Sequence, residues 1–239
     1  MPLEMISFEL FGNRVIFYYR MNSHADCGVI HQIFKQEDYN LSHWTQGHRL
    51  MEYYRSLTKP ALIVDAGANI GASALYFLNC YRNSLLFAVE PDLENWKLLE
   101  LNTRSYTNRF CFLGGVADRN GSMFLQDPGL GEWGFRLASA GEKAVQTICV
   151  DSVMAQLECR GTTPLIMKID IEGGEEFLFA SNTDWISLFP VIIIELHDWM
   201  LPWSGSSSNF FRCLANREFD VVHRGENLFL FNREILGGK

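Results

Sequence analysis

The fold of this chain is decided by residues 61–71, ALIVDAGANIG. The apolar run Ala61–Val64 is typical of a strand that is buried on both faces of a parallel sheet. An aspartate ends the run, and two glycines then allow a tight turn in which the backbone can approach a ligand closely. A helical pattern follows over residues 71–81. This strand–turn–helix unit predicts an α/β fold with a binding site at the carboxyl end of the strand.

The alternation of apolar runs and helical patterns continues toward the C-terminus. Predicted strands cover residues 84–89, 110–116, 165–169 and 191–194, and predicted helices cover 92–106, 175–181 and 209–216. Residues 220–223 and 227–231 have the pattern of a closing antiparallel pair, and strand-like segments at 122–125 and 145–150 interrupt the third helix position. Strands that alternate with helices indicate βαβ units. We therefore expect a Rossmann-like, doubly wound, mostly parallel sheet.

The N-terminal quarter of the chain has a different pattern. Alternating apolar residues on both sides of a Gly-Asn pair predict a β-hairpin over residues 3–20. Residues 28–56 carry two helical stretches, and Ser42 is a candidate N-cap for the second. We expect residues 1–58 to form a hairpin-and-helix extension and residues 59–239 to form the main domain.

Composition narrows the class of protein. The chain has 239 residues, of which 48% are apolar and 20% charged, as in ordinary globular domains. The 20 Lys and Arg against 28 Asp and Glu give a net charge of −8, which disfavours nucleic acid as a partner. No apolar run approaches ~18 residues, so no membrane span is expected. Six scattered cysteines without zinc spacing, and no basic segment typical of a signal peptide, predict a cytoplasmic protein with free thiols.

The turn after the first strand indicates which cofactor the site takes. Glu90 ends the next strand, 19 residues past Gly71, where a carboxylate can accept hydrogen bonds from ribose hydroxyls. A dinucleotide site needs a second glycine where this chain has Asn69, because a side chain there crowds the pyrophosphate. Asp65 adds negative charge to the same loop. The pattern therefore favours S-adenosylmethionine, a cation without phosphates, over NAD.

Four blocks of this sequence resemble the FkbM family of class I S-adenosylmethionine-dependent methyltransferases. The blocks are VDAGANIG (64–71), VEPDLEN (89–95), MKIDIEGGE (167–175) and IIELH (193–197). The resemblance covers about residues 63–198, and the K-x-D-x-E-G-x-E block is its most specific part. The family often has alanine at the position of Gly174. The resemblance implies O-methylation of a secondary-metabolite or sugar hydroxyl, and residues 1–58 assign no substrate.

The resemblance also implies roles for individual residues in binding the cofactor. Glu90 would hold the ribose, and Asn95 would brace its loop. Ala117 and Asp118, after the third strand, would flank the adenine. The residues that would line the methionine end of the cofactor are Asp65, Gly67, Asn69 and Gly71, and Ala68 and Asp170 are further expected cofactor-binding residues.

Ionisable residues gather at the ends of the fourth and fifth predicted strands. Asp170 and Glu195 end these strands, Glu172 follows on the face of Asp170, and His197 lies just beyond. An alcohol is a poor nucleophile until a base takes its proton, so these four residues are the candidate catalytic groups. Lys168 is expected to pair with a buried carboxylate.

Other interpretations of these residues stay open. Glu172 could instead stabilise the N-terminus of the next helix, Glu195 could be the partner of Lys168, and His197 could be a solvated loop residue. A divalent metal held by Asp170, Glu195 and His197 is compatible with their oxygen and nitrogen ligands, but no spacing demands one, and it is not favoured.

Two aromatic, glycine-containing loops are candidate lids over the acceptor. Trp133 lies in the first, and Trp199 and Trp203 lie in the second. Residues 1–58 are a candidate cap on the same side. We expect a small-molecule or glycan acceptor, although a protein acceptor stays open. The alternatives in other classes are a methyltransferase-like scaffold without turnover and an NAD-dependent oxidoreductase.

Overall fold

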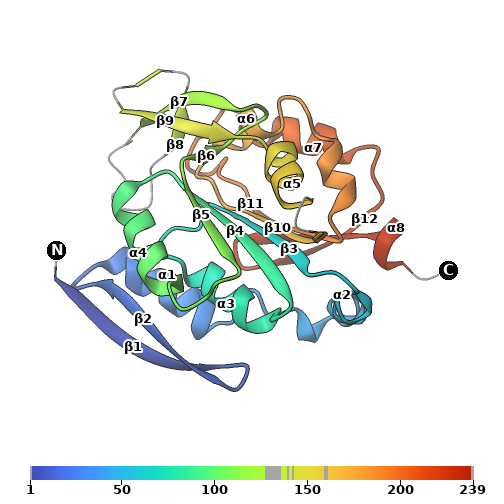
Figure 1. Cartoon of the computed structure of the whole chain (residues 1–239). Coiled ribbons are helices and arrows are strands. Elements are labelled where there is room, and N and C mark those ends of the chain that lie inside the picture. Colours follow the sequence, from blue (N-terminus) through green and yellow to red (C-terminus); the bar gives the residue numbers. More distant parts are fainter. Residues whose placement is uncertain (1, 127–135, 139, 142, 159–160, 238–239) are drawn as a thin grey trace.

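A mixed sheet of seven strands forms the centre of the protein in this computed structural model (Figure 1). The structure describes residues 2–126, 136–138, 140–141, 143–158 and 161–237. In spatial order the strands are β12 (Phe219–Arg224), β13 (Asn227–Asn232), β11 (Val191–Glu195), β10 (Thr163–Ile169), β3 (Ala61–Ala66), β4 (Ser84–Glu90) and β5 (Arg109–Leu113). Five of them, β11, β10, β3, β4 and β5, run parallel, whereas β13 is antiparallel to both of its neighbours. The predicted Rossmann-like sheet with a closing antiparallel pair is confirmed.

The strand order reverses between β3 and β10, in the middle of the sheet. From β3 the chain moves outward through β4 and β5, and from β10 it moves outward in the other direction through β11. Lys168 of β10 lies in register with Asp65 of β3, and the Asp170 N–H donates to the Ala66 carbonyl at 3.0 Å. Ligands of doubly wound sheets bind outside the carboxyl ends of the strands at such a reversal. The two predicted acidic strand ends therefore meet where a ligand is expected.

Helices cover both faces of this sheet (Figure 1). One face packs against α1 (His24–Phe34), α2 (Thr45–Ser56), α3 (Ala72–Cys80), α4 (Leu93–Thr103) and α8 (Arg233–Leu236), and the other against α5 (Val150–Glu158), α6 (Glu175–Leu178), η2 (Asp184–Leu188) and α7 (Ser208–Leu214). Successive residues of β3 enter different cores: Ile63 lies in the first, and Leu62 and Val64 lie in the second. A strand buried on both faces explains the continuous apolar run from which the fold is predicted.

The N-terminal extension is part of the first core. The predicted hairpin is present as β1 (Leu3–Leu10) and β2 (Asn13–Arg20), and Phe17 is fully buried with residues of α1 and α3. Helix α1 begins four residues before the predicted helical region, because Ser23 caps it by accepting from the Asp26 N–H. The prediction of Ser42 as an N-cap is wrong. Ser42 lies in the short helix η1 (Leu41–His43), and α2 begins after Trp44, because this extra turn comes first.

A second, smaller sheet stands beside the main one. Its strands, in spatial order, are β6 (Gly115–Val116), β9 (Lys143–Ile148), β7 (Gly121–Gln126) and β8 (Arg136–Ala138). The single strand predicted over 110–116 is in fact two, because the chain leaves β5 and joins the small sheet through β6. Helix α5 was not predicted, since the strand-like pattern of 145–150 extends to its first residue. None of the helices in the described part of the chain has the length and apolar character that crossing a membrane requires.

Candidate active site

The turn between β3 and α3 places backbone groups, rather than Asp65, at the surface of the site. Asp65 is fully buried beneath the turn, where its Oδ2 accepts from the Ser73 hydroxyl at 2.6 Å. Gly67 has a φ of +79°, and a Cβ built on it would lie 1.6 Å from the Asp170 carbonyl oxygen. Only glycine fits there, because the turn passes directly over the end of β10. Asp65 therefore supports the turn from beneath, through its hydrogen bond with Ser73. Its predicted contact with the methionine end of a cofactor is not seen at the surface of the site.

Glu90 ends β4 and closes the turn from the other side. Its two carboxylate oxygens accept from the backbone N–H groups of Asn69 and Asp92, each at 2.9 Å. Burial raises the pKa of Glu90 to about 7, although these hydrogen bonds favour the ionised form. Asn95 lies in the first turn of α4, and its side chain accepts from Arg20 of β2 at 2.9 Å. The N-terminal hairpin is thus tied to the loop that carries Glu90.

A narrow cavity lies between this turn and the small sheet. Predicted residues that line it include Gly67, Asn69, Glu90 and Asn95. The other walls come from Val89, Pro91, Gly115, Val116, Leu137, Asp170, Ile171 and Glu172. Ala117 and Asp118, predicted to flank adenine, do not appear in the described lining. The Asp118 carboxylate instead pairs with Arg119 and accepts from the Ser181 hydroxyl at 2.5 Å.

Lys168 is the buried cation of the site. Its Nζ donates to the Gly67 carbonyl at 2.5 Å and lies 3.3 Å from Asp65 and 3.4 Å from Asp170. The two carboxylates raise the pKa of Lys168 above its usual value despite its burial. The prediction that Lys168 pairs with a buried carboxylate is confirmed. The partner is Asp65, on the neighbouring strand, and not Glu195.

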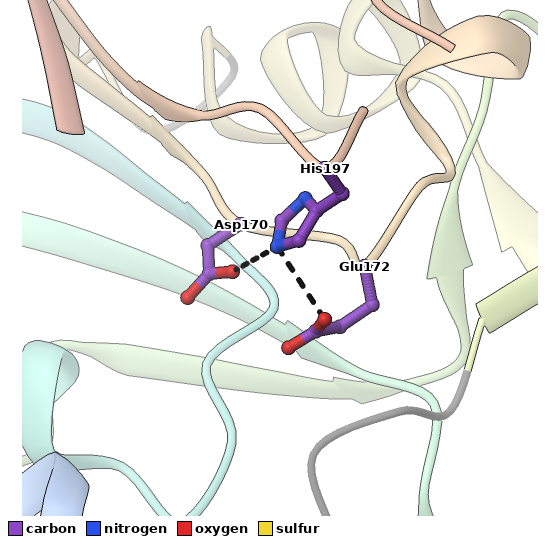
Figure 2. Close-up of side chains that lie close together, drawn as sticks. All are labelled: Asp170, Glu172 and His197. Carbon is purple, nitrogen blue, oxygen red and sulfur yellow. Dashed lines mark ion pairs between the residues drawn. The ribbon is translucent and has the colours of Figure 1, made fainter. Parts of the chain in front are cut away.

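His197 lies within a group of carboxylates just beyond the end of β11 (Figure 2). Its side chain is 1% exposed, so it is not a solvated loop residue. The ring Nδ1 is 2.9 Å from the buried Glu175 carboxylate. The ring Nε2 faces the site and lies 3.4 Å from Glu172, 3.5 Å from Glu195 and 3.6 Å from Asp170. All four predicted catalytic residues are therefore brought together.

The loop after β10 explains how Glu172 reaches this group. Glu172 has a φ of +53° and Gly173 has a φ of +91°, so the chain reverses sharply before α6 begins at Glu175. The reversal directs the Glu172 carboxylate toward His197, and Glu175 is the residue that enters the helix. The alternative role of Glu172 at the helix N-terminus is therefore not supported by this geometry.

Crowding of negative charge changes the protonation of the group. Burial, followed by the charge of Asp170, raises the pKa of Glu172 and that of Glu195 to about 8. The surrounding carboxylates, with Glu175 foremost, raise the pKa of His197 to about 10 against the opposing effect of its burial. At neutral pH the group of carboxylates around His197 can therefore hold a proton or another cation.

A larger cavity of about 440 Å³ opens in front of these residues. Its lining includes the predicted residues Gly67, Ala68, Asn69, Asp170, Glu172 and Glu195, together with Lys168, Ser73, Val29, Gln32, Ile33, Asp38, Tyr39, Trp199, Met200, Glu226 and Asn227. Sequence reasoning missed the contributions of α1 and of the β12–β13 turn. No local motif marks them, because they reach the cavity only through the packing of distant segments.

The predicted lid residues have different positions. Trp199 is 71% exposed and lines the large cavity, whereas Trp203 stands fully in solvent and does not line it. Trp133 lies outside the described residues. The lid function of these loops stays a prediction.

The charges of the large cavity fit a cationic cofactor. Its described lining carries five carboxylates, those of Asp38, Asp170, Glu172, Glu195 and Glu226, and one cation, Lys168, which is already paired. A sulfonium and an ammonium group would be stabilised by this excess of negative charge, whereas a pyrophosphate would be repelled.

Comparison with known proteins identifies the family. Residues 65–219, well over half of the chain, match the methyltransferase FkbM domain. The chain belongs to the FkbM methyltransferase family. As a member of this family it is an S-adenosylmethionine-dependent methyltransferase, so the resemblance seen in its motifs is confirmed and a nicotinamide-dependent reaction is not supported.

Three solved structures of similar architecture are distant from this chain in sequence. Precorrin-6y C5,15-methyltransferase from Geobacter metallireducens is 11% identical, with 77% of this chain and 84% of that chain covered and a TM-score of 0.38. A methyltransferase from Geobacter sulfurreducens is 10% identical, with 89% of each chain covered and a TM-score of 0.37. TrmK from M. capricolum, solved with S-adenosyl-homocysteine, is 8% identical, with 77% of this chain and 66% of that chain covered and a TM-score of 0.33. No match is found among the curated proteins.

Proposed function

We propose that this FkbM-family protein methylates a hydroxyl group of a small molecule, sugar or glycan. The observation that carries the proposal is that the narrow and the large cavity share four wall residues, Gly67, Asn69, Asp170 and Glu172. A cofactor whose ribose is held at Glu90 would extend along this shared wall toward the carboxylates. The remainder of the large cavity would then receive the acceptor.

The cavity has the chemistry of a site for a polyhydroxylated ring. Val29, Ile33 and Met200 offer apolar surface, while Gln32 and Asn227 offer amide groups. Sugar rings and many secondary metabolites have an apolar face and hydroxyl-bearing edges, which such a wall would match. Helix α1 supplies part of this wall, which supports the role of residues 1–58 as a cap over the acceptor.

The carboxylates of Glu172 and Glu195 supply a base for the acceptor hydroxyl. S-adenosylmethionine, when bound, supplies a methyl group on a positively charged sulfur. In their ionised forms Glu172 and Glu195 can accept the hydroxyl proton, and their raised pKa values of about 8 make them stronger bases than ordinary carboxylates. The deprotonated hydroxyl oxygen would then be held in the cavity to receive the methyl group, which the cofactor would supply while the electron pair of its carbon–sulfur bond stays on sulfur.

The charge of the cavity argues against nucleic acid as the acceptor. A phosphate backbone would meet carboxylates from the loops after α1 and β10, from the end of β11 and from the β12–β13 turn, and the lysine in the described lining is buried and already paired. The net charge of −8 adds to this repulsion at longer range.

The experiment that tests the proposal measures transfer directly. The purified protein is incubated with S-adenosylmethionine labelled in its methyl group and with a panel of hydroxyl-bearing sugars and phenolic or polyketide-type alcohols. Label recovered as an alkali-stable methyl ether supports the proposal. Label on nitrogen or in a carboxyl ester contradicts the assignment to a hydroxyl.

A scaffold without turnover is the competing function. Mass spectrometry of the purified protein, together with calorimetry of S-adenosyl-homocysteine binding, separates the two. A protein that binds the cofactor product and releases it in exchange for S-adenosylmethionine is equipped for turnover. A protein that binds neither would be a scaffold, and the proposal would fail.

A further inference from the structure

The geometry points to a divalent metal site made by His197, Asp170, Glu172 and Glu195. Sequence spacing alone does not favour a metal here, because these residues come from two separate segments of the chain. The fold brings single ligand atoms of Asp170, Glu172 and His197 within 4.8 Å of one another (Figure 2). Glu195 adds a third carboxylate, whose Oε1 is 3.5 Å from the same ring nitrogen.

The orientation of His197 is the first argument for a metal. The ring is 99% buried, given its 1% exposure, and its hydrogen bond within the described structure is made by Nδ1 to Glu175. Nε2 is left aimed into the cluster, where carboxylates surround it at 3.4 to 3.6 Å without a hydrogen bond. A buried carboxylate that holds the far nitrogen of a histidine is the usual outer-shell arrangement of a metal-bound imidazole. Glu175 would fix the ring so that its Nε2 lone pair points at the ion.

The spacing of the ligand atoms is the second argument. Bonds of about 2.1 Å place neighbouring ligand atoms about 3.0 Å apart, and bonds of about 2.4 Å place them about 3.4 Å apart. The observed separations of 3.4 to 3.6 Å around Nε2 lie close to this range. One ion could therefore sit among these side chains after small side-chain movements, with no change of the backbone.

Access and charge are the third argument. The side chains of Asp170, Glu172 and Glu195 are 30%, 23% and 14% exposed, and all three line the large cavity. An ion could therefore enter from solvent. The carboxylates of the group outnumber the one nearby ammonium, that of Lys168, which also neutralises Asp65. One nitrogen and several carboxylate oxygens form a donor set suited to Mn²⁺ or Mg²⁺ rather than to a soft metal.

The role of the ion rests on the proposed function. The site lies on the wall that both cavities share, where the acceptor hydroxyl would meet the methyl donor. A divalent cation there would bind the hydroxyl oxygen and make its proton easier to transfer to a carboxylate oxygen of Glu172 or Glu195 that the ion leaves free. Metal binding itself does not depend on that reaction, so the two are tested separately.

The test is a titration of the full chain with Mn²⁺, with and without S-adenosyl-homocysteine, in which free Mn²⁺ is measured by electron paramagnetic resonance. We expect one Mn²⁺ per chain, with a nitrogen coupling from imidazole in the bound spectrum. His197→Gln should abolish that coupling, and Glu172→Gln should weaken Mn²⁺ binding by ~10-fold or more. Glu176→Gln removes the same charge four residues away, on α6 and outside the group, and should bind Mn²⁺ like the wild type.

Several results would overturn the metal site. These are an absence of bound Mn²⁺ under both conditions, equal binding by all variants, or a nitrogen coupling that survives in His197→Gln. The imidazole would then serve as a protonated counter-ion for the carboxylates. If His197→Gln fails to fold, Asp170→Asn, at a partly exposed side chain, carries the same expectation of a ~10-fold loss.

Failure of the proposed function would look different. Glu90→Gln should lose affinity for the cofactor product and keep its Mn²⁺, because Glu90 lies outside the metal group. Bound Mn²⁺ without any methyl transfer would contradict the proposed function and leave the metal site standing. Methyl transfer that EDTA does not affect would instead show that the ion takes no part in the reaction.

Discussion

Glu90 holds a carboxylate at the buried end of β4, where its ionisation depends on the surrounding structure. Two backbone N–H groups favour the charged form, and burial opposes it more strongly, so the pKa rises to about 7. A carboxylate binds ribose hydroxyls more strongly when ionised, because hydrogen bonds to a charged acceptor are stronger than those to a neutral acid. Cofactor binding should therefore depend on pH in the physiological range.

We predict that affinity for S-adenosyl-homocysteine rises as the pH increases from 6 to 8, since Glu90 loses its proton on passing pH 7. Glu90→Gln should weaken binding at pH 8 by about 1.5–3 kcal/mol and flatten this pH dependence. Calorimetry at several pH values measures both effects. Glu94→Gln, at an exposed position on α4 that pairs with Lys97, is the matched control and should behave like the wild type. An unchanged pH profile in Glu90→Gln would show that another group controls binding.

Lys168 illustrates the energetic cost of separating a buried ion pair. Lys168→Met would leave Asp65 charged and fully buried without its cation. We predict a loss of about 3–5 kcal/mol in the free energy of unfolding, measured by denaturant titration. Lys97→Met breaks the exposed pair with Glu94 and should cost less than about 1 kcal/mol. Equal costs for the two variants would contradict the expectation that burial makes the Lys168–Asp65 pair costly to break.

At the scale of elements, the site depends on how the turn after β3 packs on the end of β10. Gly67 lies so close to the Asp170 carbonyl that no side chain fits between them. The same turn offers the Asn69 N–H to Glu90 and the Gly67 carbonyl to Lys168. One turn therefore joins the ends of β3, β4 and β10, and its conformation fixes the wall between the two cavities.

Gly67→Ala should disrupt this junction. The new Cβ would meet backbone 1.6 Å away, so β10 or the turn must move. We predict a loss of more than about 3 kcal/mol in the free energy of unfolding, together with reduced cofactor affinity, since backbone strain and a steric clash add. Gly161→Ala is the control, because Gly161 also has a positive φ but has open space around its Cβ position. It should cost only about 1–2 kcal/mol. If both variants lose the same stability, the clash at Gly67 is relieved without cost.

At the scale of the whole molecule, the N-terminal extension is continuous with the main domain. Phe17 of β2 and Leu50 of α2 are fully buried in the same core as Ile63 of β3. Arg20 of β2 forms a buried ion pair with Asp26 and also donates a hydrogen bond to Asn95 of α4. Residues 1–58 thus form a separate segment of sequence without forming a separate core.

We therefore predict that a fragment of residues 59–239 does not unfold cooperatively. Removing the extension would expose the apolar surface of α3 and of the sheet face beneath it, as well as one wall of the large cavity. Near-ultraviolet circular dichroism and a thermal denaturation curve measure this. A sharp unfolding transition with native-like aromatic signals in the fragment would show that the extension is an independent cap.

The sequence alone determined the sheet and the identities of the acidic groups at its edge. Strands buried on both faces must be apolar throughout, so their runs are visible without a structure, and Asp65, Glu90, Asp170 and Glu195 mark where four of them end. Local patterns do not record which distant segments meet. Only the tertiary structure placed Asp65 beneath the site and Glu175 behind His197.

The tertiary structure also decided what closes the site. The wall from α1 and the β12–β13 turn has no local signature, because these residues reach the cavity through packing between segments far apart in the chain. The same reason explains the metal proposal. Spacing along the chain gives no metal pattern for Asp170, Glu172 and His197, whereas adjacent parallel strands bring their ligand atoms within 4.8 Å.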